Sequence, residues 1–324
     1  SMGPDTIIFK LNKDEQSTQL EFKKQIFDVS TNISMKALIA LNESPSFSTN
    51  YYAIPSLSYN YTYLAMNNKP DGIKRKKIFS SIKTRKAIAC ATPVEQIMQL
   101  IYGAYAKNST RMVSMVSPLK PYVNRELSPI PFDLKVADSL LLADGWLNDK
   151  NGRYKIINGV ATPFKFDLHY LNTNQDWKDM ALLIAEKYNL LGITVNLIPL
   201  DLKLFIDKAR GHDYDMMLGS WGGTSTFEDY TQLWHTSSWE NNGSNYSGFG
   251  NEESDSLINT MRTTLDTALR NKACLALQTK IYDEQPIVFL YCTLRRNIVH
   301  KRWKNIEIFA ERPGLMLDNL ILKK

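Results

Sequence analysis

The feature that most constrains this fold is an alternation of strand and helix patterns between residues 164 and 220. A predicted helix at 176–191 and a second that begins at Asp201 each connect two apolar strand patterns. The predicted strands are 164–171, 193–197 and 214–220. Such a β-α-β-α-β run forms parallel strands joined by right-handed crossovers, and ligands bind beyond the carboxyl ends of those strands. We therefore expect an α/β sheet whose loops 172–177 and 221–230 open on one rim.

The loop after the third strand carries the candidate binding site. Residues 221–249 hold seven aromatic side chains, and the strand before them breaks on Gly222 and Gly223. Exposed aromatic rings on a loop at a strand end commonly line a ligand cleft. A single ring of this kind is more often core packing, so the prediction rests on the cluster. The predicted ligand-binding residues are Trp221, Gly222, Gly223, Thr224, Asn67, Asn174, Trp234 and Tyr246.

Patterns on both sides of this run predict further elements. They are a buried strand at 7–11, two helices around a short strand within 18–41, a strand at 60–67, a helix from Thr84 that restarts with Thr92 as N-cap, a helix capped by Asp133, helices at 255–261 and 267–284, and a strand at 287–291. Residues 114–131 are rich in proline and are the expected crossing between two domains. Asn148 to Gly152 resembles part of a calcium loop but lacks its other ligand positions, so we expect a plain turn.

Composition favours a globular chain with two cores. The 324 residues are 44% hydrophobic and 22% charged, which argues against disorder. No apolar run is long enough to span a bilayer. The net charge of +6 includes a basic run from Lys74 to Lys77, but no aromatic residues alternate with it, so we expect a solvated turn and no nucleic-acid partner. Cys90, Cys274 and Cys292 form no CxxC unit and are expected to be small core residues.

No catalytic, metal-binding or cofactor-binding motif stands out. Ser220 lies in LGSWG, where leucine replaces the first glycine of the G-x-S-x-G nucleophile motif. The four histidines are scattered and show no metal-ligand spacing. Glu228 and Asp229 are adjacent and point in different directions, whereas a glycosidase needs two carboxylates that face each other. We therefore expect a binding protein without enzyme activity, metal or cofactor.

Several short motifs follow one another in a familiar order. They are Tyr63 to Asn67 (YLAMN), Thr84 to Ala91 (TRKAIACA), Ala137 to Trp146 (ADSLLLADGW), Leu190 to Val195 (LLGITV) and Ser220 to Gly222 (SWG). In this order and spacing the chain resembles the family 5 extracellular solute-binding proteins, the oligopeptide- and dipeptide-binding components of ABC importers. Each motif is weak alone, and the specificity comes from their succession.

The resemblance implies a periplasmic-binding-protein-like (class II) α/β fold with two lobes. It implies that residues 109–292 form one complete lobe, and that 1–108 and 293–324 form part of an outer lobe. Family members carry further upstream residues, so we expect a fragment, and Ser1 to Gly3 resembles an expression-tag remnant. The implied protein is a monomer that delivers a small peptide or oligosaccharide to a membrane permease. Its implied location is the periplasm or cell envelope, with a lipid anchor in the full-length protein.

Two departures from the family pattern bear on the ligand. Peptide-binding members usually carry an aspartate three residues after the cleft tryptophan, where this chain has Thr224, and dipeptide-binding members place an arginine in the loop that here spans residues 171–177. Because a buried charge needs a partner, an oligosaccharide stacked on Trp221 or Trp234 is an alternative ligand, unless Glu228 or Asp229 substitutes. A cytoplasmic ligand-sensing module of a transcriptional regulator is a further alternative.

Overall fold

The predicted β-α-β-α-β run lies at the centre of the fold. The computed structural model describes residues 3–11, 14–31, 33–69, 78–157, 159–240 and 243–323, and the Lys74–Lys77 run falls outside these ranges. The run consists of β6 (Lys165–Leu171), α7 (Gln175–Asn189), β7 (Thr194–Leu200), α8 (Leu202–Arg210) and β8 (Met216–Trp221). β6 pairs in parallel with β7 on one side and with β8 on the other, which confirms the predicted parallel arrangement.

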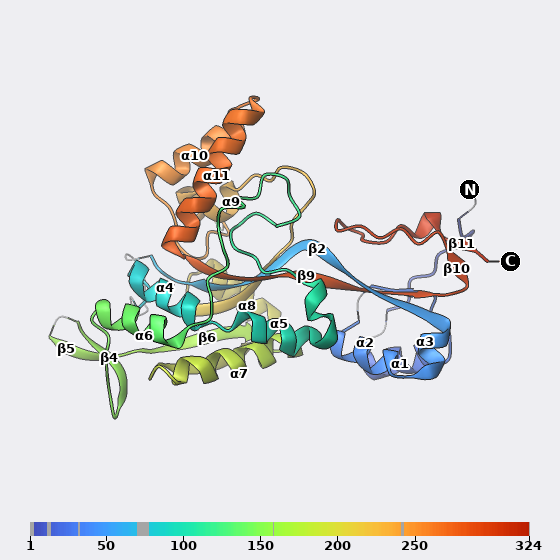
Figure 1. The fold of residues 1–324 in the computed structure, drawn as a ribbon, viewed down its shortest axis with the longest axis horizontal. Coiled ribbons are helices and arrows are strands. Elements are labelled where there is room, and N and C mark those ends of the chain that lie inside the picture. The colour runs from blue at the N-terminus through green and yellow to red at the C-terminus, as the bar shows by residue number, and fades with distance from the viewer. Residues whose placement is uncertain are drawn as a thin grey trace.

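Two long strands extend this unit into a six-stranded mixed sheet. β2 (Tyr51–Met66) is antiparallel to β8 and to β9 (Ile287–His300), and β1 (Val29–Ser30) pairs with the outer side of β9. The predicted strands at 60–67 and 287–291 are therefore parts of longer elements. Figure 1 shows β2 and β9 crossing the molecule from the helix-rich half to the half that holds both termini. A register shift between Leu57 and Tyr61 leaves residues 58–60 as a bulge in β2.

Helices α4 (Ile82–Ala91), α5 (Val94–Tyr102) and α6 (Leu134–Ala143) pack with one another or with α7. The side chain of Asp133 caps α6 as predicted, and η1 (Gly103–Asn108) follows α5. Thr92 does not cap α5, because its hydroxyl lies 2.7 Å from both the Ile88 carbonyl and the Tyr188 hydroxyl. Pro93 takes the N-cap position of α5 instead.

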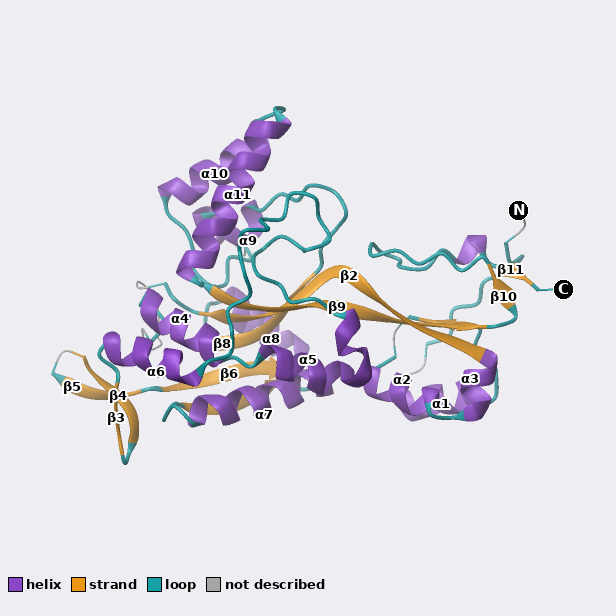
Figure 2. Ribbon diagram, in the orientation of Figure 1, coloured by secondary structure: helices purple, strands orange, loops and turns teal. Residues whose placement is uncertain are grey.

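The remaining elements surround the sheet. They are a three-stranded sheet of β3 (Leu147–Asp149), β4 (Gly152–Ile157) and β5 (Val160–Pro163), then α9 (Thr231–Trp234), η2 (Thr236–Ser238), α10 (Glu252–Thr263) and α11 (Thr267–Glu284). Residues 148–152, which resemble part of a calcium loop, span the turn between β3 and β4, as predicted. The proline-rich segment 114–131 contains no helix or strand. Figure 2 shows the α10–α11 pair standing away from the central sheet beside long loops. Within the described ranges, no helix has the length and apolar character needed to cross a membrane.

The terminal region contains the clearest wrong prediction. Its elements are α1 (Glu15–Lys23), α2 (Met35–Asn42), α3 (Pro45–Asn50), β10 (Trp303–Lys304), η3 (Leu317–Asn319) and β11 (Ile321–Leu322). Residues 7–11 form no strand, and Ile8, Phe9 and Leu11 are 86%, 82% and 95% exposed. The apolar run has no neighbouring strand or core to pack against among the described residues.

The predicted division between residues 108 and 109 does not coincide with a break in packing. The carboxyl half of β2 pairs with β8, and α4 packs on α6, so residues from both predicted lobes share one sheet and one core. The division into lobes remains a prediction.

All three cysteines are buried free thiols, in agreement with the sequence-based expectation. Burial raises the pKa of the Cys90 thiol, and raises the pKa of Cys274 to about 12 and of Cys292 to about 11. Because the thiolate is the reactive form, we expect the native protein at pH 8 to be inert toward a thiol-specific disulfide reagent. In denaturant, the same assay is expected to detect three reactive thiols per chain. Rapid labelling of any one thiol in the native state would contradict this burial.

Candidate functional site

The site is built at the carboxyl end of β8, where the strand-end loop (residues 222–230) leaves the sheet. Trp221 is the last residue of β8 and pairs with Tyr61 of β2. Its ring is half-buried against the core, whereas Gly222 and Thr224 are exposed. This edge of β8 therefore presents one tryptophan face and a stretch of accessible backbone.

Glycine at position 223 has a steric reason. A Cβ atom there would lie 2.5 Å from the Tyr59 carbonyl oxygen, in the bulge of β2, so the two backbones approach too closely for any larger residue. A Cβ atom at Gly222 would meet nothing closer than 3.6 Å, where Asn60 Oδ1 lies, and 3.8 Å, where Arg312 Nη2 lies. Gly222 thus keeps a small gap open between the strand end, the bulge and the C-terminal part of the chain.

A buried ion pair fixes the strand-end loop. Lys120 donates to the Glu228 carboxylate and, at 3.1 Å, to the Thr226 carbonyl, and the side chains of Lys120 and Glu228 are 1% and 15% exposed. Glu228 Oε1 also accepts the Thr224 amide at 3.1 Å. The charge of Glu228 is therefore balanced inside the protein by Lys120.

The C-terminal hairpin (residues 308–315) reaches the same loop. The bridge between Ile308 and Leu315 closes this hairpin, and Arg295 Nη2 donates to the Ala310 carbonyl at 3.1 Å. At its tip, Glu311 accepts hydrogen bonds from the Ser225 amide and hydroxyl, which hold the pKa of Glu311 below its usual range. Residues of the predicted outer lobe thus meet the strand-end loop of the predicted second lobe.

The predicted site residues do not all come together. Asn67 lies at the opposite end of β8, because β2 is antiparallel to that strand, and its amide donates to the His212 and Tyr214 carbonyls at 2.9 and 3.1 Å. Asn174 uses its side chain to cap α7 by accepting the Trp177 amide. Both side chains therefore have structural roles in this conformation, and ligand contact by Asn67 and Asn174 stays a prediction.

Of two further predicted residues, Trp234 lies in the core and Tyr246 is partly buried. Trp234 is 2% exposed, and its ring packs against Phe249 and Phe289 with centroids 5.5 and 6.2 Å away, so no face is left for a ligand. Tyr246 is partly buried against the core, and its carbonyl accepts the Tyr214 hydroxyl. The residues that the structure does place together are Trp221, Gly222, Gly223 and Thr224.

Sequence reasoning missed Lys120, Glu311 and Arg312. Lys120 lies in the proline-rich segment and Glu311 and Arg312 lie more than 80 residues beyond the loop, so no local spacing connects them to it. Ser220, considered above as a nucleophile, has no hydrogen bond to a histidine or carboxylate in the described part of the chain. No group of three or more potential metal-ligating side chains occurs among the described residues.

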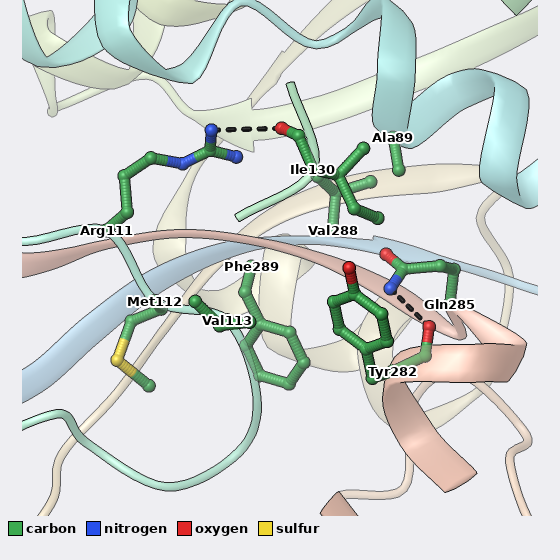
Figure 3. A pocket seen from close by; sticks show the side chains of 9 residues that line it. All are labelled: Ala89, Arg111, Met112, Val113, Ile130, Tyr282, Gln285, Val288 and Phe289. Carbon is green, nitrogen blue, oxygen red and sulfur yellow. Dashed lines mark hydrogen bonds between the residues drawn. The ribbon is translucent and has the colours of Figure 1, made fainter. Parts of the chain in front are cut away.

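Figure 3 shows a small pocket whose lining includes Arg111, Tyr282 and Gln285 and no residue of the strand-end loop. Arg111 donates to the Ile130 carbonyl at 3.0 Å, and Gln285 donates to the Tyr282 carbonyl at 2.6 Å. Its volume is about 20 Å³, which holds roughly one water molecule and no solute. A larger pocket of about 220 Å³ lies between Phe227–Tyr230 and the helices α10 and α11.

Comparison with known proteins gives a consistent result. The sequence profile described as "Bacterial extracellular solute-binding proteins, family 5 Middle" matches residues 3–244, more than half of the chain. The oligopeptide-binding protein AppA of Bacillus subtilis is 25% identical over 244 residues, which cover 75% of this chain and 43% of that protein. The chain spans about half the length of the curated relatives it matches.

Solved structures agree on the fold. The structure of Bacillus subtilis AppA in complex with a nonapeptide has a TM-score of 0.78 at 20% identity, covering 96% of this chain and 59% of that one. NikA from Brucella suis, in complex with Fe(III)-EDTA, has a TM-score of 0.81 at 19% identity, covering 97% of this chain and 61% of that one. The predicted periplasmic-binding-protein-like α/β fold is therefore confirmed.

Proposed function

The chain belongs to family 5 of the bacterial extracellular solute-binding proteins, and from this premise we propose that it binds a peptide-like solute for an ABC-type importer. The observation that carries the proposal is the end of β8, where the half-buried Trp221 is followed by the exposed residues Gly222 and Thr224, and where the next residue, Ser225, donates to Glu311 of the C-terminal hairpin. An extended peptide can add main-chain hydrogen bonds to such a strand end, while the tryptophan face packs on a side chain. The role is binding and release, without catalysis.

The C-terminal hairpin supplies the charges that the strand-end loop lacks. Within the described residues, neither Glu311 nor Arg312 forms an ion pair, although Glu311 is held by Ser225 and Arg312 lies beside Gly222. A carboxylate and a guanidinium on one rim match the ammonium and carboxylate ends of a peptide. This arrangement favours a peptide over an uncharged ligand, in spite of threonine at position 224.

An oligosaccharide remains the second candidate ligand. The observation in its favour is that Glu228 is neutralised by Lys120, so the loop itself offers a half-buried tryptophan and backbone groups without a free charge. Mass spectrometry of small molecules that co-purify with the full-length protein decides between the two. Recovered peptides would exclude the glycan proposal, and recovered glycans would exclude the peptide proposal.

The remaining parts of the proposal concern partners and place. A membrane permease is the expected partner, because a solute-binding protein of an importer must deliver its ligand to one. The expected location is the periplasm or the cell envelope, with a lipid anchor on the full-length protein. Recovery of the full-length protein in the membrane fraction, together with incorporation of a labelled lipid into it, tests the location and the anchor. Co-purification with a permease tests the partner.

Replacing Trp221 with alanine tests the site at the level of one residue. We expect weaker solute binding by at least about 1 kcal/mol, which is about fivefold in Kd, because the ring loses its stacking contact. Isothermal titration calorimetry with the recovered solute measures the change. Trp303→Ala is the matched control, since Trp303 lies in β10 and donates to Asp28. An unchanged Kd with an intact fold would remove Trp221 from the site.

A further inference from the structure

A second cavity lies behind the strand-end loop. This pocket, of about 220 Å³, is bordered by Phe227 and Tyr230 of the loop, by Ile258, Met261 and Arg262 of α10, and by Arg270 of α11. Its wall combines these aromatic and aliphatic side chains with Glu228 and Asp229, and two guanidinium groups lie at its border. The predicted binding residues Trp221 to Thr224 do not line it.

Several polar groups at this pocket have no hydrogen-bond or ion-pair partner in the described part of the chain. The Arg270 guanidinium lies 4.7 Å from the centroid of the Phe227 ring, and its Nε is buried without a hydrogen-bond acceptor. Among the described residues, neither Arg262 nor Arg270 forms an ion pair. The Tyr230 hydroxyl is also buried and has no hydrogen-bond partner within the described ranges. Buried donors are normally satisfied, so these groups lack an acceptor.

The two acidic residues at the pocket are already engaged. Glu228 pairs with Lys120 and accepts the Thr224 amide, and Asp229 accepts the Thr231 amide at 2.9 Å. Among the described residues, neither carboxylate forms an ion pair with Arg262 or Arg270. The negative charge of Asp229 nevertheless disfavours a doubly charged occupant such as a phosphate.

We propose that this pocket binds a carboxylate attached to a compact apolar group. The carboxylate would accept hydrogen bonds from Arg270 and Arg262 in the planar geometry that guanidinium groups favour. The apolar group would pack against Phe227, Ile258 and Met261. The carboxylate belongs either to a separate small organic acid or to the solute bound at Trp221, and the test separates these sources. With a separate acid the proposal is independent of the proposed solute site, whereas with the solute's own carboxylate it rests on the proposed function.

The first arm of the test uses free acids. The probe is 3-phenylpropanoate, and the neutral match is 3-phenylpropanamide, both titrated into the full-length protein by calorimetry or ligand-observed NMR. We expect the amide to bind at least about tenfold more weakly, because it cannot form charge-assisted bonds with the guanidinium groups. Arg270→Met is expected to weaken the acid by a similar factor. Arg210→Met, an exposed arginine at the end of α8, is the matched control.

The second arm uses peptides with a free carboxyl terminus and their amidated counterparts. Where the free acids alone show no binding, the peptides decide. If Arg270→Met then weakens the binding of free-carboxyl peptides and leaves that of amidated peptides unchanged, the pocket is assigned to the solute's own carboxylate. Acid binding that survives Trp221→Ala assigns it to a separate acid. Equal binding of acid and amide, or no dependence on Arg270 in either probe set, overturns the proposal. Arg262→Met replaces Arg270→Met if thermal unfolding shows that the latter does not fold.

Discussion

Replacing Lys120 with methionine is expected to lower the free energy of unfolding by about 3–5 kcal/mol, the usual cost of breaking a buried ion pair from one side. The substitution keeps the approximate length of the side chain and removes its charge. Glu228 would then remain inside the protein without its cation, and the Thr226 carbonyl would lose a donor. Because the side chain of Lys120 is only 1% exposed, water cannot take its place without rearrangement of the loop.

Urea-induced unfolding of the wild type and the variant measures this difference. Lys203→Met is the matched control, since Lys203 pairs with Asp207 at 2.9 Å while the two side chains are 88% and 56% exposed. Such a surface pair contributes less than about 1 kcal/mol. Adding Glu228→Gln to Lys120→Met removes the stranded charge and should recover a large part of the loss. Equal effects at Lys120 and Lys203 would show that the buried pair is not coupled to stability.

The parallel unit was predictable because its signals are local. Asp201 caps α8, and the apolar stripe of the 176–191 pattern ends beside Gly192, whose φ of 75° suits glycine. Alternation between strand and helix periods then allows few topologies. Elements of this kind are specified by residues close in sequence, so their boundaries differ from the structure by only a few residues.

The failures involve contacts between distant segments. The 7–11 run shows only that a segment is apolar, and what covers it depends on residues elsewhere. Trp221 and Trp234 both lie in the aromatic-rich stretch 221–249, so the sequence predicts a binding role equally for both. In the structure Trp234 is buried in the core, whereas Trp221 is half-exposed. Asn67 lies away from Trp221 because β2 runs antiparallel to β8, and the motif around Asn67 does not reveal this direction. The Lys120–Glu228 pair joins residues 108 positions apart, and neither neighbourhood predicts the other.

Substitution of Gly219 by alanine is expected to destabilise the protein by about 1–3 kcal/mol through overpacking at the end of β8. Gly219 lies directly opposite Tyr63 of β2, and a Cβ atom there would lie 2.5 Å from Cε2 and 2.7 Å from the hydroxyl oxygen of that ring. Tyr63 is 6% exposed, so its ring has little room to move. The displacement would pass to Trp221, two residues further along the strand, and we expect solute binding to weaken as well.

Gly222→Ala is the matched control for this substitution, because its Cβ would meet no atom closer than 3.6 Å and is expected to change stability by less than about 1 kcal/mol. Tyr63→Leu should make room for the added methyl group, so the cost of Gly219→Ala should fall in that background. Thermal unfolding of the four variants measures both expectations. An undiminished cost in the Tyr63→Leu background would refute the collision as its cause. A diminished cost would mean that glycine before Ser220 serves the packing of β8 on β2, and that its likeness to a nucleophile motif has a structural origin.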